Sequence, residues 1–444
     1  MRGRKQKTKP GQVDRVMRSK LRHHKTLQFP RGFLWGAATS AHQVEGNNIH
    51  NDWWAWEKSS KKHPDSNSAC DSYNRYHEDF NLVEKHHHNV HRLSIEWSRL
   101  EPREGQWDEE AIKHYRLVLR DLKQRKIKTM VTLHHFTLPN WFARLGGFSR
   151  KRNYEYFTDF VQKAAENFGD LVDFWITLNE PMVYTTQGYL NGVWPPHESN
   201  KLKTLRVYKS LRRAHRKSYA ILHKVHKLKK WPAAKVGISN NAVSFYSYHR
   251  HSLLDYLFIT VGDFLWNHMF YWNNKRFHDF IGVNYYFHHR IIHKRYRLLS
   301  FFEPARRESR DMSSVGWEIN PQGLFDVLLD LQRYDKPIYV TENGIATLNE
   351  SKRARFLVSY IKEIYHALQA GVDIRGYTYW SLLDNFEWEK GFEPRFGLIG
   401  VNFKNQVRVP RYTAKVYGEI AKTNSLPHKM LRLLGHEGDK DYKV

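Results

Sequence analysis

The chain has 444 residues, of which 41% are hydrophobic and 15% aromatic, so it can bury a large core and is not disordered as a whole. Lys and Arg outnumber Asp and Glu by 72 to 45, and this charge of +27 attracts polyanions and anionic surfaces without defining a site. The single cysteine, Cys70, excludes an intrachain disulfide and fits a reducing compartment, so we expect a cytoplasmic protein.

The basic charge is partly concentrated at the N-terminus, where residues 1–25 hold ten Lys or Arg and one acid, Asp14. We expect residues 1–28 to form a basic, disordered arm. The composition leaves open a plain solvated arm, weak adhesion to nucleic acids, other polyanions or membranes, and a targeting role. The arm lacks the apolar core of a secretory signal, and no run in the chain approaches the ~18 apolar residues of a membrane span. Residues 426–444 are expected to form a polar tail.

Short apolar segments alternate with longer helical patterns along the rest of the chain. Helices with charged outer faces are predicted at 108–126 and at 351–371, the second ending at Gly371. The segments expected to form strands are 32–41, 90–98, 128–136, 172–180, 234–241, 279–286, 337–344 and 374–384.

Alternating strands and helices predict a parallel sheet with crossover helices, the α/β class. Eight such units close as a single (β/α)8 TIM barrel, which we place at residues 29–425 because no Pro-, Gly- or Ser-rich linker divides them. A doubly wound open sheet is the alternative, but neither a phosphate loop nor a dinucleotide loop supports it.

The barrel predicts an active site at the C-terminal ends of its strands. The stretch 172–184, VDFWITLNEPMVY, ends its buried strand with Asn179 and Glu180, and Pro181 cannot continue the ladder. Other expected strand ends carry further polar and aromatic side chains, namely His134, His135, Asn284, Tyr285, Tyr286, Glu342, Asn343, Trp380, Asp384, Asn385, Glu387 and Trp388.

Two glutamates at separate strand ends, Glu180 and Glu342, suggest paired acid and nucleophile chemistry. Glycoside cleavage uses two such carboxyl groups, and the surrounding amides, imidazoles and indoles suit a sugar ring. Either glutamate alone is more simply explained by a strand-end ion pair, but several polar residues at matching strand ends weaken that explanation.

The sequence resembles glycoside hydrolase family 1, the retaining β-glucosidases and β-galactosidases, from about Phe29 to about Ala421. Six motifs carry the resemblance in the family's order: FLWGAATSAHQVEG, RLSIEWSRLEP, TLNEP, IGVNYY, YVTENG and WSLLDNFEW.

The resemblance implies a role for each matching residue. Glu180 would be the general acid/base, Glu342 the nucleophile, and Asn179 the ligand of the sugar 2-hydroxyl. Arg92 and Tyr286 would hold and ionise the nucleophile, and Tyr286 would also contact substrate. The remaining expected substrate-binding residues are Gln43, His135, Asn284, Trp380, Glu387 and Trp388, with Asn284 supporting the acid/base. The implied reaction needs no cofactor.

Glu387 favours an unphosphorylated β-glucoside as substrate, with galactosides or fucosides as secondary substrates, because a carboxylate repels a phosphate dianion. Met182 follows NEP where many family members have Trp, which leaves the aglycone preference open. Residues 242–280 match the family least well.

The histidine-rich run KHHHNVH, residues 85–91, is a weak metal motif because it lacks cysteines or carboxylates at ligand spacing, so no metal site is expected. His134 is better explained as a core residue. Two alternative functions stay open: a sugar-binding protein on the same barrel without catalysis, and a polyanion-binding protein that uses the basic arm.

Overall fold

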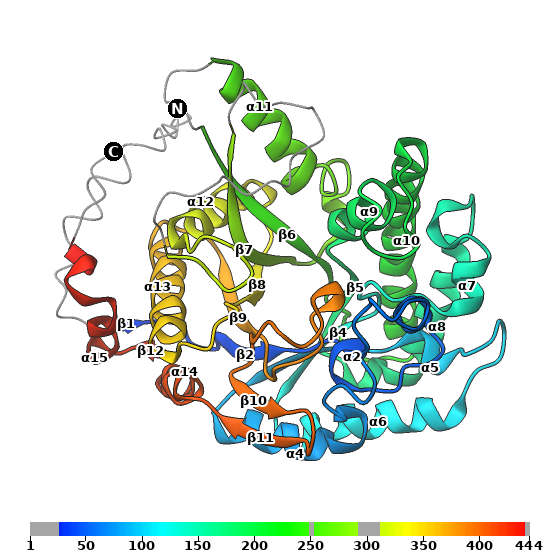
Figure 1. The fold of residues 1–444 in the computed structure, drawn as a ribbon, viewed down its shortest axis with the longest axis horizontal. Coiled ribbons are helices and arrows are strands. Elements are labelled where there is room, and N and C mark those ends of the chain that lie inside the picture. Colours follow the sequence, from blue (N-terminus) through cyan, green and yellow to red (C-terminus); the bar gives the residue numbers. More distant parts are fainter. Residues whose placement is uncertain (1–25, 248–252, 292–310, 440–444) are drawn as a thin grey trace.

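A single closed barrel forms the centre of the computed structural model, which describes residues 26–247, 253–291 and 311–439 (Figure 1). Each barrel strand is parallel to its neighbours, and β9 closes the barrel onto β2. The barrel strands are β2 (Leu34–Ala38), β3 (Val90–Ser94), β4 (Lys128–Thr132), β5 (Phe174–Asn179), β6 (Val236–Ser247), β7 (Ile281–Ile291), β8 (Ile338–Asn343) and β9 (Ile374–Trp380). All eight expected strands and the predicted (β/α)8 barrel are therefore confirmed, and the open sheet is excluded.

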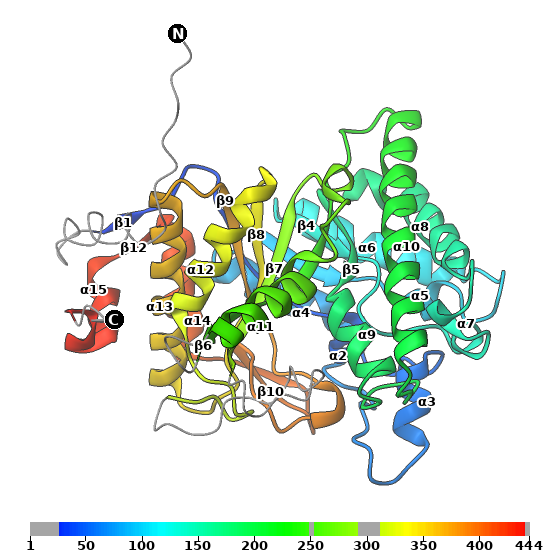
Figure 2. The same ribbon diagram turned by 90° about the horizontal axis from the view of Figure 1, so that it is seen from above.

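Helices surround the barrel, as Figures 1 and 2 show. The helices in the described residues are α2 (Ala41–Val44), α3 (Asp52–Lys58), α4 (Ser72–Lys85), α5 (Trp97–Leu100), α6 (Glu109–Gln124), α7 (Asn140–Arg144), α8 (Tyr154–Phe168), α9 (Pro181–Tyr189), α10 (Lys201–Leu228), α11 (Leu253–Asp263), α12 (Pro321–Leu331), α13 (Glu350–Gln369), α14 (Tyr412–Thr423) and α15 (His428–Leu431). Both helices predicted from the sequence are present, as α6 and α13.

Local signals explain where these two helices begin and end. The Asp108 side chain accepts hydrogen bonds from the backbone N–H of Glu110 and Ala111, which caps the start of α6. The Asn349 side chain caps α13 in the same way. Gly371 follows α13 with a φ of +92°, a left-handed conformation that glycine adopts without steric cost.

The two ends of the described chain are joined by a short antiparallel pair. Strand β1 (Leu27–Gln28) pairs with β12 (Ser425–Leu426), and both leucines are buried. The expected domain boundaries, arm 1–28 and tail 426–444, therefore cut through paired residues. The tail is also less polar than expected, since Met430 in α15 is buried against the core. Residues 1–25, on which the arm prediction depends, lie outside the described residues.

Strands β6 and β7 run beyond the ends predicted for them, at 241 and 286. Their pairing continues through Ser244 with His288 to Ser247 with Ile291. These longer strands bring the chain to α11, within the region that matched the family motifs least well. The remaining short strands, β10 (Ile399–Asn402) and β11 (Val407–Pro410), form a separate antiparallel pair.

Apolar strand residues fill the barrel, because strands covered on both faces are buried throughout. Leu34, Val90, Met130, Phe174 and Tyr339 belong to one small buried cluster. Two residues after Val90 along β3, and hence on the same face of that strand, stands the fully buried Arg92. An apolar floor therefore lies beneath polar side chains at the C-terminal ends. Within the described residues, none of the helices has the length and apolar character to cross a bilayer.

Candidate active site

The polar residues predicted at the strand ends meet at one end of the barrel. Arg92 comes from β3, Asn179 and Glu180 from the end of β5, and Glu342 from β8. Hydrogen bonds or ring contacts connect every predicted site residue to another member of the set: Gln43, Arg92, His135, Asn179, Glu180, Asn284, Tyr286, Glu342, Trp380, Glu387 and Trp388.

Glu342 is held by two strong donors. The guanidinium of Arg92 donates from Nη1 to Oε1 of Glu342, and the phenol of Tyr286 donates to Oε2 at 2.6 Å. Arg92 is fully buried and Glu342 is 4% exposed, so solvent screens their charges little. A positive charge and a phenol O–H both stabilise an ionised carboxylate. Burial and the charge of Glu342 raise the pKa of Tyr286 well above its usual value, so the phenol keeps its proton.

Among the described residues, the hydrogen-bond partners of the Glu180 carboxyl group are two side-chain amides. Asn284 Nδ2 and Asn241 Nδ2 donate to Oε1 of Glu180, at 2.8 and 3.3 Å. Burial, and then the charge of Glu342, raise the pKa of Glu180 from an ordinary 4.5 to about 8. Since both amides engage Oε1, Oε2 is the oxygen left to carry an exchangeable proton. The two glutamates are thus prepared for opposite tasks.

The backbone at Glu180 explains how its side chain is aimed. Glu180 has a φ of +43°, in the left-handed region that a residue with a side chain rarely adopts. Pro181 then occupies the first position of α9, where its fixed φ suits a helix start. Pro181 was expected only to stop the strand; it also begins the next helix, and the sharp turn between the two elements carries Glu180.

Two asparagines connect the two carboxyl groups. Asn179 Oδ1 accepts from Arg92 Nη2 at 2.7 Å and from Asn284 Nδ2 at 3.1 Å. Asn284 Oδ1 in turn accepts from the hydroxyl of Thr341 at 2.7 Å. Arg92 on the Glu342 side and Asn284 on the Glu180 side are therefore fixed relative to each other.

A third carboxyl group, Glu387, lies among neutral donors. Trp380 Nε1 donates to Oε1 of Glu387 at 3.3 Å, and Gln43 Nε2 lies 3.5 Å from Oε2. The ring of His135 is nearly parallel to the indoles of Trp380 and Trp388, with centroids 6.0 and 6.2 Å away. Amide, indole and carboxyl groups beside aromatic faces can bind sugar hydroxyls and cover a sugar ring.

Burial raises the pKa of Glu387 to about 8. At neutral pH the raised pKa therefore favours the protonated form of this carboxyl group. From the sequence, Glu387 was expected to repel phosphate as a full negative charge. Its raised pKa weakens that expectation. The surroundings still disfavour phosphate, because the hydrogen-bond partners of Glu387 in the described residues are uncharged donors rather than cations.

The sequence reasoning missed Asn241, which ends the fifth predicted strand and donates to Glu180. The strand-end rule applied to the other strands would have found it. It also missed Trp266, whose Nε1 donates to Asn241 Oδ1 at 3.2 Å. Trp266 lies in the π-helical turn η3 (Phe264–His268), and no motif in the sequence points to it.

His134 takes the core position expected of it. Both of its ring nitrogens are buried without a hydrogen-bond partner in the described part of the chain, and the ring packs edge-on against Phe148 and Tyr184. Burial lowers its pKa to about 3, so the ring is neutral.

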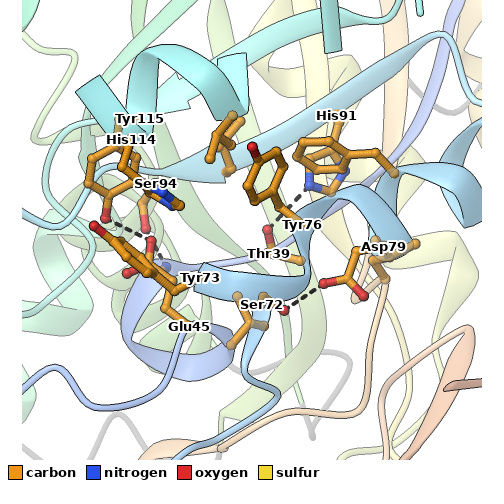
Figure 3. A pocket seen from close by; sticks show the side chains of 16 residues that line it. Thr39, Glu45, Ser72, Tyr73, Tyr76, Asp79, His91, Ser94, His114 and Tyr115 are labelled. Carbon is orange, nitrogen blue, oxygen red and sulfur yellow. Dashed lines mark hydrogen bonds between the residues drawn. The ribbon is translucent and has the colours of Figure 1, made fainter. Parts of the chain in front are cut away.

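Within the described residues, the side chains of the histidine-rich run 85–91 make no hydrogen bond to the residues of the candidate active site. His91 lines a separate hollow of about 40 Å3 between α2, α4, α6 and the barrel wall, where Glu45 accepts from Tyr115 (Figure 3). Among the described residues, the one group of three potential metal ligands that converges is Asp263, His268 and Asp330, outside this run.

Comparisons with known proteins identify the family of the chain. The model of glycosyl hydrolase family 1 matches residues 25–255 and 270–426. A 1,4-β-D-glucan glucohydrolase of Thermotoga neapolitana is 30% identical, and the match covers 90% of this chain and 99% of the relative. A β-galactosidase of Pyrococcus woesei is 29% identical, covering 90% and 98%. The β-glycosidase from Pyrococcus horikoshii superimposes with a TM-score of 0.86 at 38% identity, over 93% of this chain and 99% of that one. The chain belongs to glycosyl hydrolase family 1, whose members are retaining glycoside hydrolases.

Proposed function

We propose that this glycoside hydrolase cleaves unphosphorylated β-D-glucosides, with β-galactosides and β-fucosides as further substrates, by double displacement. The observation that carries the proposal is the unequal environment of two buried carboxyl groups. Glu342 is bound by Arg92 and Tyr286, whereas Glu180 is bound by amides and has a pKa raised to about 8. Relatives named as glucan glucohydrolase and as β-galactosidase support both sugar types.

In the first step the carboxylate of Glu342 attacks the anomeric carbon, and the bond to the aglycone oxygen breaks. The proton on Glu180 passes to that oxygen, so the aglycone leaves as an alcohol. The charge of Glu342 is consumed in the new ester, which removes one cause of the raised pKa of Glu180. Asn179, fixed by Arg92 and Asn284, is assigned to the sugar 2-hydroxyl.

In the second step Glu180, now a carboxylate, takes a proton from water while the water oxygen attacks the anomeric carbon. The ester bond to Glu342 breaks, the sugar leaves with its β configuration, and both carboxyl groups return to their starting states. For this retaining route the two carboxyl groups should lie about 5–5.5 Å apart.

The sugar that is transferred is proposed to be bound by five residues: Gln43, His135, Trp380, Glu387 and Trp388. Largely protonated Glu387 can donate one hydrogen bond and accept others, which suits a pair of neutral hydroxyls. A phosphate dianion would find no guanidinium or ammonium group among the hydrogen-bond partners that Glu387 has in the described part of the chain. The substrate class therefore follows from uncharged donors rather than from charge repulsion.

Turnover of p-nitrophenyl β-D-glucoside tests this proposal, comparing the wild type with Glu180→Ala and Glu342→Ala, each with and without azide. We expect wild-type activity, loss of activity in both variants, and a β-glycosyl azide from Glu180→Ala alone. The same product from Glu342→Ala would reverse the two roles. An absence of wild-type turnover on gluco-, galacto- and fucosides would contradict the enzyme and leave a sugar-binding protein.

A further inference from the structure

The flank of the barrel at α11 exposes an unusual number of large apolar side chains. Nineteen such side chains are exposed in the described residues, and eight of them fall within residues 253–272. Leu253 is 86% exposed and Leu257 58%. The eight residues, called here the α11 apolar face, are Leu253, Leu254, Tyr256, Leu257, Val261, Phe264, Leu265 and Trp272.

Helix α11 exposes its apolar side, whereas an ordinary surface helix buries its apolar side and exposes its charges. Its Asp255 and Gly262 are buried while its leucines face outward. Contiguous exposed apolar surface of this kind marks a site of interaction. The family model leaves residues 256–269 unmatched, so five of the eight residues of this face lie outside the part of the chain that matches the family.

A strongly cationic helix lies on the same side of the molecule as this face (Figure 2). Helix α10 carries ten Lys or Arg residues and not one Asp or Glu over residues 201–228. It is tied to the segment that follows α11, because Tyr208 donates to Met269 O and Arg216 donates to Asn273 O, both at 2.8 Å. Figure 2 shows α10 and α11 on the same, near side of the molecule.

Three cations on this side are free to meet an external anion. Lys209, Arg213 and Arg276 are exposed, and none has a carboxylate within 4.0 Å in the described part of the chain. Apolar side chains next to unpaired cations match the boundary of an anionic bilayer, where acyl chains lie beneath negative headgroups.

We propose that the α11 apolar face and the adjoining cationic side of α10 dock the enzyme on the surface of an anionic lipid membrane, with α11 lying in the interface. A nucleic acid would use the cations but gain nothing from exposed leucines. A second copy of the chain would bring two cationic α10 helices, and two chains of charge +27, towards each other. The eleven residues of α11 lie on the bilayer and do not cross it.

Sedimentation of the full chain with vesicles tests this surface. The vesicles are pure phosphatidylcholine, or phosphatidylcholine with about a third phosphatidylglycerol, at low and high salt. We expect the protein to sediment with the anionic vesicles only. Leu253→Gln combined with Leu257→Gln should lower its partition coefficient about tenfold or more, because two leucine side chains that the bilayer would bury are lost. The matched control Leu348→Gln, which replaces a leucine 81% exposed elsewhere, should change nothing.

A cationic variant completes the test. Lys209→Gln, Arg213→Gln and Arg276→Gln together should weaken vesicle binding by about tenfold to 100-fold, since each cation near an anionic surface contributes about 1 kcal/mol. All variants should retain wild-type turnover of p-nitrophenyl β-D-glucoside, which separates loss of docking from misfolding. If the wild type turns over no glucoside, circular dichroism replaces turnover as the control for correct folding. Failure of the proposed glucosidase function can then be distinguished from failure of the proposed membrane docking.

Three results would overturn the proposal. The first is equal sedimentation of the leucine variant and the wild type. The second is vesicle binding that disappears when residues 1–25 are deleted and is untouched by the leucine changes, which would assign it to the basic arm. The third is a dimer in size-exclusion chromatography that the leucine changes dissociate, which would make the face an interface between copies.

Discussion

Glu342 and Glu180 are the same side chain at two ends of one barrel, yet their surroundings differ in kind. The β8 side gives Glu342 a guanidinium and a phenol, whereas the β5 side gives Glu180 two amides. Both groups are buried, so burial alone would make them alike. We assign the two roles from these partners: a cation and a phenol donor suit Glu342 as the nucleophile, and neutral amides suit Glu180 as the acid.

This comparison also shows that the two sides are coupled. Arg92 binds Glu342 directly and reaches the Glu180 side through Asn179 and Asn284. The charge on Glu342 is itself a cause of the raised pKa of Glu180. A change on one side should therefore be detected on the other.

Removing the cation should have the largest effect. We expect Arg92→Met to lower kcat/KM by about 10²–10³, because it leaves a buried carboxylate unpaired at a cost of about 3–5 kcal/mol. Arg408→Met, which breaks the buried pair with Asp79, is the control. An equal loss of kcat/KM in both variants would mean that only stability had changed.

Removing the acid should stabilise the protein at high pH. The folded pKa of Glu180, about 8, exceeds its ordinary 4.5, so the folded state binds the extra proton between these values. Stability from this group is therefore full below about pH 4.5 and is lost as pH rises to about 8, by about 3–5 kcal/mol. Glu180→Gln removes that loss.

The measurement is urea unfolding of Glu180→Gln and of the wild type at pH 5 and pH 9. The advantage of the variant should grow with pH. A constant difference between the two proteins would mean that the pKa of Glu180 is not raised by folding.

Removing the phenol should have a moderate effect. Tyr286→Phe deletes the 2.6 Å hydrogen bond to Glu342 and should lower kcat/KM by about ten- to a hundredfold, as expected for about 1.5–3 kcal/mol to a charged acceptor. Tyr285→Phe is the neighbouring control, because its hydroxyl binds Asn320 O instead. Activity should be kept in the control, and equal activity of the two variants would place Tyr286 outside the nucleophile's support.

The smallest effect is expected at Asn241. Its amide favours the ionised form of Glu180, so Asn241→Ala should raise the pKa of Glu180 and shift the basic limb of the kcat/KM profile upward. We expect about half a pH unit, since the 3.3 Å contact is a weak hydrogen bond. Asn240→Ala, whose amide binds Trp266 O, should leave the limb in place. A downward shift would contradict the assignment.

The sequence sufficed for the barrel because buried parallel strands are short apolar runs that are easy to recognise, and their polar last residues stand out. Glu180 at the end of ITLNE is the clearest case. The extensions of β6 and β7 were missed because AVSFYS and FHHR mix polar and apolar residues without a strand signal. The raised pKa of Glu387 could not be predicted, because it depends on how deeply the folded chain buries this side chain. Helix α11 contradicts the usual rule that leucines face the core.

Trapping the covalent intermediate tests the division of labour most directly. An activated 2-deoxy-2-fluoro-β-glucoside forms the glycosyl ester quickly and releases it slowly, so the labelled protein can be digested and its peptides identified by mass spectrometry. The label should lie on Glu342, in the peptide that contains β8, and Glu180 should be unlabelled. A label on Glu180, or steady turnover of β-glucosides in which neither glutamate is ever labelled, would contradict the account.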